Sequence, residues 1–236
     1  MGDTSGMRVN EIFYSIQGEG KYAGYPMVFV RLQGCSMKPP CSWCDTPYAY
    51  DPKGGLDMSV EAVYQEVERL VSPYKCIACI TGGEPLMQVT SCGALVRRLN
   101  QGGFMVEIET NGIHPIPSWE RDVSSWCVDI KCPSSGVQGR FLEDWLDMRS
   151  TDQLKLVVGT KEDLGYAKEV VVKRRMGEPE MMVSPVIHSG YDDLTGGECS
   201  ILNREWLQEV AEFCKAERVK FSLQLHKVIW GPKKGV

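Results

Sequence analysis

Residues 77–85 read Ile77-Ala78-Cys79-Ile80-Thr81-Gly82-Gly83-Glu84-Pro85, an apolar run that ends in a glycine turn. The run is short and rich in β-branched side chains, as in a buried strand. Residues 85–100 begin with proline and precede the pair Gly102-Gly103, which is the usual punctuation of a helix. The stretch therefore predicts one strand–turn–helix unit.

The same alternation recurs along the chain. Most of the predicted strands are expected to be apolar on both faces, which is typical of a parallel sheet with helical cover. A complete eight-unit barrel takes about 250 residues, whereas this chain has 236 and spends much of its first half on loops. We therefore predict one α/β domain over 1–236, a partial, open (β/α) barrel of about six units. Further strands are predicted at 28–32, 105–108, 127–130, 154–158, 181–183 and 219–225, and helices at 59–71, 161–175 and 204–216.

Composition narrows the class of protein. Hydrophobic residues make up 43% of the chain and charged residues 24%, with a net charge of −5 that argues against general nucleic-acid binding. No apolar run approaches the roughly 20 residues that span a bilayer, and the first six residues do not resemble a secretory signal. We expect a cytoplasmic protein with no nucleic-acid or membrane partner. Its ten cysteines would then stay reduced.

Three of these cysteines, Cys35, Cys41 and Cys44, follow the strand at 28–32 with the spacing Cys-x5-Cys-x2-Cys. Zinc usually takes four protein ligands, whereas a [4Fe–4S] cluster held by three thiolates keeps one iron open for a ligand. The spacing alone leaves open a zinc site that borrows a fourth ligand. The other cysteines are predicted to be buried structural thiols: Cys76 and Cys79 in a Cys-x2-Cys at a strand, and Cys92, Cys127, Cys132, Cys199 and Cys214.

Polar motifs stand where strands end, which is the catalytic side of such barrels. The turn at 81–85 offers glycines for close approach of a ligand, the N–H groups of a helix start, and the Glu84 carboxylate as a partner for an ammonium group. Arg31 could grip a carboxylate in two places, and His226 is expected at the end of the last strand. A plain turn at Asn111-Gly112 and an edge ion pair between Asp129 and Lys131 remain alternatives.

Taken together, these motifs resemble the radical SAM superfamily and, within it, the 7-carboxy-7-deazaguanine synthases. The first cysteine gap has five residues, where the usual superfamily pattern has three, and the synthase family tolerates longer loops. The resemblance is carried by residues 16–20, 29–35, 41–46, 81–85 and 224–227.

The resemblance implies the following roles. Cys35, Cys41 and Cys44 would ligate the cluster, and Thr46 would give its hydroxyl to Mg²⁺, which prefers oxygen ligands. Residues 224–236 would close the substrate site, although this chain runs on past His226, so a role for the terminal carboxylate stays open. Cofactor-binding residues would be Trp43, Cys44, Asp45, Gly82, Gly83, Glu84, Asp129, Ile130, Lys131, Ser184, Pro185, Val186 and Ile187, and substrate-binding residues Ile16, Gln17, Gly18, Arg31, Thr81 and His226.

The implied activity is that of a radical SAM carbon–nitrogen lyase. It would convert 6-carboxy-5,6,7,8-tetrahydropterin to 7-carboxy-7-deazaguanine with loss of ammonia, in 7-deazapurine (queuosine-type) biosynthesis. Its cofactors would be a [4Fe–4S] cluster, S-adenosyl-L-methionine and Mg²⁺. A flavodoxin- or ferredoxin-type protein would supply electrons, and the protein would be a homodimer. An activase of a glycyl-radical enzyme and a zinc-binding module are the alternatives.

Overall fold

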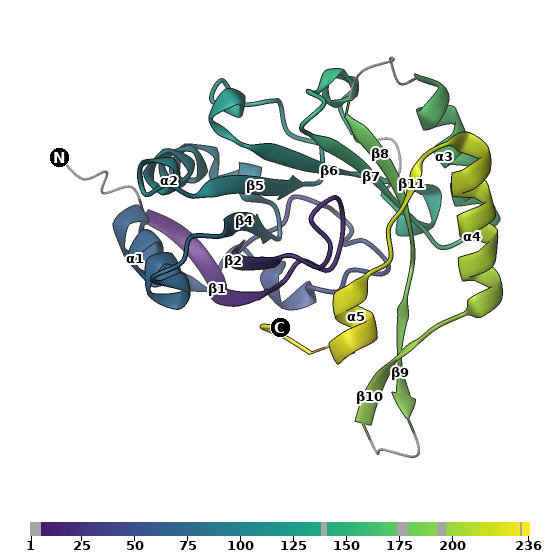
Figure 1. The fold of residues 1–236 in the computed structure, drawn as a ribbon, viewed down its shortest axis with the longest axis horizontal. Helices are drawn as coiled ribbons and strands as arrows, with labels where there is room; N and C mark the ends of the chain where they lie inside the picture. The colour runs from purple at the N-terminus through teal and green to yellow at the C-terminus, as the bar shows by residue number, and fades with distance from the viewer. Residues whose placement is uncertain (1–5, 138–140, 174–178, 193–196, 232) are drawn as a thin grey trace.

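The computed structural model describes residues 6–137, 141–173, 179–192, 197–231 and 233–236, with backbone only for 189–192 and 197–201. Nine strands in these ranges form one open sheet (Figure 1). They are β1 (Gly6–Ile16), β2 (Pro26–Leu32), β3 (Leu56–Ser59), β4 (Ile77–Gly82), β5 (Met105–Thr110), β6 (Ser125–Lys131), β7 (Gln153–Val158), β8 (Glu180–Pro185) and β11 (Lys220–Phe221), in the order β11-β8-β7-β6-β5-β4-β2-β1-β3. A separate hairpin, β9 (His188–Asp192) and β10 (Gly197–Ile201), projects from the body of the molecule (Figure 1).

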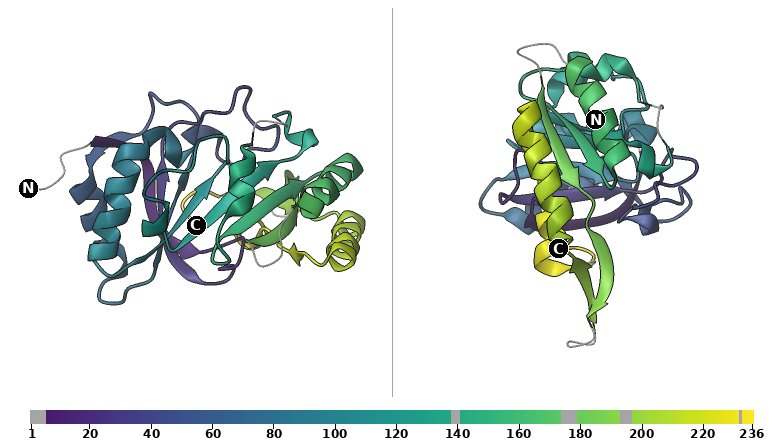
Figure 2. Two further views of the ribbon diagram at one scale, coloured as in Figure 1. Left: turned by 90° about the horizontal axis from the view of Figure 1, so that it is seen from above. Right: turned by 90° about the vertical axis from the view of Figure 1, so that its right-hand side faces the viewer.

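Seven strands, from β2 through β4–β8 to β11, run parallel and are joined by six crossovers. Four crossovers contain an α-helix: α1 (Val60–Val71), α2 (Val89–Gln101), α3 (Lys161–Lys173) and α4 (Arg204–Glu217). The helices α3 and α4 lie side by side over β7 and β8 (Figure 2). The predicted partial, open barrel of about six units is confirmed, and the antiparallel strands β1 and β3 extend one edge of it.

In their described residues, the crossovers β5–β6 and β6–β7 contain 3₁₀ turns and no α-helix; the turns lie at Glu120–Asp122, Pro133–Ser135 and Glu143–Asp147. Tryptophans cover the sheet there instead. Trp126 stacks on Trp119 with ring centroids 5.8 Å apart and meets Trp145 at 5.3 Å. Trp126 and Trp145 are fully buried, so these rings supply the apolar cover that an amphipathic helix gives elsewhere.

The helix at 59–71 is confirmed as α1, and Ser59 caps it by accepting the Ala62 N–H. The predicted helix at 85–100 begins with a 3₁₀ turn over Pro85–Gln88 before α2. The predicted strand at 219–225 is wrong, because only Lys220–Phe221 pair with β8. The chain then leaves the sheet, and α5 (Leu225–Trp230) begins where the Leu225 N–H reaches the Gly18 carbonyl at 2.9 Å.

The expectation that the strands are apolar on both faces is also wrong. On β5, Val106 and Ile108 pack in the main apolar core, whereas Glu107 and Glu109 face the other way. On β7, Leu154 and Leu156 alternate in the same manner with polar neighbours. The helix-facing side of the sheet is therefore apolar, and its other side carries the buried polar groups of a cavity.

None of the helices in the described ranges is long and apolar enough to cross a membrane.

The turn after β4 leaves no room for a side chain at Gly83. A Cβ there would lie 2.1 Å from the Gly34 carbonyl oxygen and 2.7 Å from the Ala49 oxygen, both backbone atoms. We expect Gly83→Ala to lower the free energy of unfolding by about 1–3 kcal/mol or more, as overpacking does. Gly165→Ala on α3, where a Cβ would meet nothing within 4 Å, should raise it by up to about 1 kcal/mol. Urea unfolding of both variants is the measurement, and equal effects would contradict the close approach.

Candidate active site

A cavity of about 720 Å³ lies at the carboxyl ends of the parallel strands. All three cysteines of the predicted cluster loop line it, together with the glycine turn after β4 and polar side chains from β5, β6 and β7. Residues from both ends of the chain complete the wall, namely 16–19 and 224–236 in part. The parallel register brings these segments together, since strands that run in one direction end at one edge.

The cluster loop leaves β2 at Cys35, whose N–H donates to the Tyr50 carbonyl at 3.0 Å. Burial raises the pKa of the Cys35 thiol, and raises that of Cys41 to about 11. Both are half-buried and Cys44 is exposed. Among the described residues, these three sulfurs do not form a group within 4.8 Å of one another. Three thiolates that bind one zinc ion must have their sulfurs this close together, because each Zn–S bond is about 2.3 Å. In a cubane cluster each thiolate binds a different iron, so the sulfurs lie farther apart. The donor set therefore fits a three-thiolate [4Fe–4S] cluster.

The loop is also tied to the segment that follows β6. Ser42, between Cys41 and Cys44, donates its N–H to the Ser135 carbonyl at 3.1 Å and its hydroxyl to the Ser134 carbonyl at 2.6 Å. Asp163, a fully buried carboxylate in the first turn of α3, accepts the Ser134 N–H at 2.9 Å and the N–H groups of Gly159 and Thr160. The cluster loop thus rests on a segment that α3 holds.

The turn Gly82–Gly83–Glu84 is bound to the start of the cluster loop. The Gly83 N–H donates to the Leu32 carbonyl at 3.1 Å, and the Glu84 N–H to the Gly34 carbonyl at 2.8 Å. The Glu84 carboxylate is fully buried and accepts from the Leu86 N–H, the Thr110 hydroxyl and the Asn111 N–H. Burial raises its pKa to about 6 despite these donors. Its observed contacts are therefore structural, and its contact with a cofactor ammonium stays a prediction.

A second polar group forms the part of the cavity next to β1, β4 and β5. Thr81 donates its hydroxyl to Glu109 at 2.7 Å, and the Gln17 amide donates to both Glu109 and Glu107 at 3.1 Å. The Gln153 amide donates to the other oxygen of Glu107 at 2.6 Å. Burial, followed by the charge of Glu109, raises the pKa of Glu107 to about 8.

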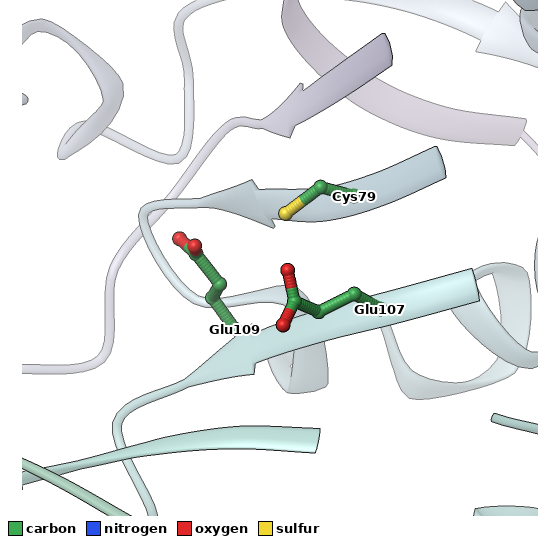
Figure 3. A group of neighbouring side chains, drawn as sticks. All are labelled: Cys79, Glu107 and Glu109. Carbon is green, nitrogen blue, oxygen red and sulfur yellow. The ribbon is translucent and has the colours of Figure 1, made fainter. Parts of the chain in front are cut away.

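Figure 3 shows Glu107 and Glu109 beside Cys79 of β4. In the described residues, these three form the group of potential metal ligands whose ligand atoms lie within 4.8 Å of one another. Burial raises the pKa of the Cys79 thiol well above its ordinary value, however, and Glu107 is already satisfied by two amides. We interpret the group as a buried polar cluster, of which Glu109 lines the cavity, rather than as a metal site.

Arg31 at the end of β2 donates its Nε to Glu11 at 2.7 Å, and its guanidinium lies over the rings of Phe13 and Tyr48. The hydrogen bonds of the described residues use only this nitrogen of the guanidinium. Its side chain is 14% exposed and lines the cavity. The two terminal nitrogens therefore suit a ligand carboxylate.

Two of the predicted cofactor-binding segments, 129–131 and 184–187, differ in how they lie relative to the cavity. Asp129 and Lys131 line the cavity and form an ion pair at 2.8 Å. Ile130 lies on the opposite face of β6, in the apolar core. Residues 184–187 do not appear in the wall of the cavity, so their contact with the cofactor stays a prediction.

His226 lines the cavity from α5, not from the predicted strand. Its Nε2 lies 3.8 Å from Asp45 Oδ2, and Lys227 Nζ lies 3.4 Å from the same oxygen. A Cβ at Gly18 would fall 2.0 Å from His226 Nδ1. Gly18 is therefore required by the docking of α5, a contact that no local sequence pattern reveals.

Ile16, Trp43, Thr46, Gly82 and Gly83 also line the cavity, as predicted for a common site. Sequence reasoning missed several other wall residues, although a charged residue inside an apolar strand, as at 107, 109 and 155, was an available signal. Glu19, Tyr48, Glu109 and Lys155 are among the missed residues, whereas Gln224 and residues 233–236 belong to the segment that was predicted to close the site.

Comparisons with known proteins agree with this geometry. A model described as the radical SAM superfamily matches residues 29–123. The 7-carboxy-7-deazaguanine synthase of Methanospirillum hungatei is 39% identical over 97% of this chain and 88% of its own length. The 7-carboxy-7-deazaguanine synthase of Koribacter versatilis is 36% identical over 98% of this chain and 100% of its own length. The crystal structure of QueE from Escherichia coli has a TM-score of 0.71 and covers 94% of this chain and 95% of its own, with the same fold at 22% identity.

These findings define a radical SAM enzyme of mixed α/β fold, a class that uses a [4Fe–4S] cluster and S-adenosylmethionine. More narrowly, the chain belongs to the 7-carboxy-7-deazaguanine synthase family.

The raised pKa of Glu107 predicts a pH-dependent stability. Its ordinary pKa is 4.5 and its folded value about 8, so between these values the folded chain keeps a proton that the unfolded chain releases. Stability therefore falls as pH rises, by up to about 1.4 kcal/mol per pH unit. We expect the free energy of unfolding of the wild type to drop relative to that of Glu107→Gln between pH 5.5 and 7.5 in urea titrations of the apoprotein. The exposed control Glu212→Gln should show no such trend, and a pH-independent difference for Glu107→Gln would contradict the assignment.

Proposed function

We propose that this chain converts 6-carboxy-5,6,7,8-tetrahydropterin to 7-carboxy-7-deazaguanine with loss of ammonia, as a step in 7-deazapurine (queuosine-type) biosynthesis. The observation that carries the proposal is one cavity that contains the three cluster thiols, the free end of Arg31 and the carboxylate of Glu109. The full-length relatives described above support it.

The cluster and S-adenosylmethionine, when bound, supply the 5′-deoxyadenosyl radical that starts the reaction. Cys35, Cys41 and Cys44 would hold the cluster, and Lys131, beside Cys41, contributes a positive charge to the same wall. Trp43, Asp45, Gly82, Gly83, Glu84, the Asp129–Lys131 strand end and residues 184–187 would bind S-adenosylmethionine. The chain's main contribution is to orient the reactants and to exclude water.

The substrate carries one carboxylate and a pyrimidinone edge with N–H donors. Arg31 would bind the carboxylate through its two terminal nitrogens, because its Nε is taken by Glu11. Glu109, fixed by Thr81 and Gln17, would accept from the N–H donors. Ile16, Gly18 and His226 would complete this side, and the segment 224–236 would close it.

Thr46 would bind Mg²⁺ together with the substrate carboxylate and water. Its hydroxyl lines the cavity 3.7 Å from Cys44 Sγ. Mg²⁺ favours hard oxygen ligands and keeps several waters, so one protein hydroxyl and one substrate carboxylate suffice in such a site.

Two partners belong to the proposal. A flavodoxin- or ferredoxin-type protein would reduce the cluster from the side where Cys44 is exposed. The protein would act as a homodimer.

An anaerobic assay tests the reaction directly. Reconstituted protein with S-adenosylmethionine, dithionite, Mg²⁺ and 6-carboxytetrahydropterin should yield 7-carboxy-7-deazaguanine by mass spectrometry. Cys44→Ser should lose the cluster and all cleavage of S-adenosylmethionine, whereas the half-buried Cys76→Ser should keep both. Formation of 5′-deoxyadenosine alone would move the substrate elsewhere, towards the activase alternative, and one zinc per chain without sulfide would support the zinc module.

Arg31 should act on substrate binding and not on the cluster. Replacing it by Ala removes a charge-assisted contact worth about 1.5–3 kcal/mol, so the KM for the pterin should rise by about 10- to 100-fold. The KM should stay high in Arg31→Lys, since an ammonium group cannot bind a carboxylate in two places. Steady-state kinetics with Arg97→Ala as an exposed control is the measurement, and an unchanged KM would remove Arg31 from the substrate site.

A further inference from the structure

Lys155 lies in the middle of β7, where its side chain is only 8% exposed. Its ammonium group pairs with Glu19, and lies 3.6 Å from Asp129 Oδ2. A buried ammonium group is costly unless oppositely charged groups compensate it. Because Lys155 also lines the cavity, its charge can influence how ligands bind there as well as the stability of the fold.

The two partners of Lys155 come from different parts of the cavity wall. Asp129 is on β6 and also pairs with Lys131, on the side proposed for S-adenosylmethionine. Glu19 is in the loop between β1 and β2, next to Gln17, whose side-chain oxygen accepts the Glu19 N–H at 3.2 Å. Burial would raise the pKa of Glu19, but the charge of Lys155 lowers it to about 2. One cation therefore fixes a carboxylate in each of the two proposed subsites.

Two oxygen atoms beside this group have no hydrogen-bond partner among the described residues. Gln224 is 5% exposed and donates its amide to Glu19 at 2.5 Å, which leaves its Oε1 without a donor. The buried Oδ1 of Asp129 likewise has no hydrogen-bond donor among the described residues. An unsatisfied buried acceptor costs about 1–3 kcal/mol, and both residues line the cavity. The arrangement suits a ligand that brings N–H or O–H donors to both sides of Lys155.

We propose that Lys155 is a positioning residue for the reaction, which holds Glu19 with Gln224 as acceptors for N–H donors of the pterin and Asp129 as an acceptor for adenosyl hydroxyls. This inference rests on the proposed function. Lys155 touches neither reactant in this account. It sets the distance between them by holding both acceptor groups.

The test is Lys155→Met, which keeps the length of the side chain and removes the charge. Lys168→Met is the matched control, because Lys168 pairs with Glu217 at an exposed site on α3. Both variants are reconstituted anaerobically, and their iron and sulfide contents are compared with those of the wild type. We expect Lys155→Met to keep the cluster, to raise the KM values for the pterin and for S-adenosylmethionine by about tenfold or more, and to release excess 5′-deoxyadenosine per product. Wild-type values for all three would overturn the proposal.

A double variant separates positioning from charge balance. Lys155→Met leaves Glu19 as an uncompensated buried carboxylate, and Glu19→Gln in the same chain removes that charge. If Lys155 positions the ligands, the double variant regains thermal stability while the ratio of 5′-deoxyadenosine to product stays high. Recovery of both KM values and of the ratio would show that Lys155 only balances Glu19, and would overturn the proposal.

A failure of the positioning role of Lys155 can be distinguished from a failure of the proposed function. Wild-type protein that cleaves S-adenosylmethionine without forming 7-carboxy-7-deazaguanine would reject the function. The change that S-adenosylmethionine causes in the electron paramagnetic resonance spectrum of the reduced cluster would still report on Asp129. We expect Lys155→Met to need about tenfold more S-adenosylmethionine for that change, and an unchanged titration would overturn the adenosyl half of the proposal.

Discussion

The contact between two backbone segments, Leu32–Gly34 and Gly82–Glu84, is the constraint on which the site depends. The N–H groups of Gly83 and Glu84 donate into the first segment, and a Cβ at either Gly82 or Gly83 would collide with it. Cys35 follows that segment directly. Glu84 then accepts the Asn111 N–H at the end of β5, so one turn fixes the ends of β2, β4 and β5 relative to one another. Cys35, the first of the three proposed cluster ligands, is therefore positioned by hydrogen bonds that need no bound cofactor.

The same sheet carries an apolar core on one face and a charged cavity on the other. Burying charges is costly, and the structure offsets the cost by pairing opposite charges in a chain that runs from Lys131 through Asp129 and Lys155 to Glu19. At Glu107 burial and the charge of Glu109 outweigh the opposing charges of Lys21 and Lys155, and its pKa rises to about 8. A fold selected for stability alone would fill this face with apolar side chains. The polar face is therefore the part of the fold that serves the chemistry.

Much of the architecture was predictable because helix and strand periods are local. The apolar runs and caps placed α1, α3, α4 and most of the parallel strands, and motif resemblance brought Cys35, Arg31 and Gly83 to one site. The errors fall where tertiary contacts decide. Residues 222–225 have the composition of a strand, yet the Leu225 N–H bonds to Gly18, some two hundred residues away, and a helix begins there. The charged residues inside β5 and β7, Glu107, Glu109 and Lys155, are visible in the sequence. They alternate with apolar residues, which indicates one polar face, but the sequence analysis predicts strands that are apolar on both faces.

The division between local and distant contacts also separates the proposed cofactor side of the cavity from the proposed substrate side. The cluster loop, the glycine turn and the end of β5 all lie within residues 29–123, the segment common to the superfamily. The remaining wall comes from β6 and β7 and from the chain ends. At the ends, the Gln17–Glu19 loop meets Gln224 and His226, and Lys234 lies over the Tyr48 ring at 3.7 Å. The two parts are joined by side-chain contacts, since His226 and Lys227 approach Asp45 beside Cys44 and Gln17 donates to Glu107 and Glu109. Lys155 and Arg31 stand at the boundary between them. Under the proposed function, a radical generated on the shared side would act on one substrate only if such residues fix the distance between the two halves, so specificity would depend on the groups that join them.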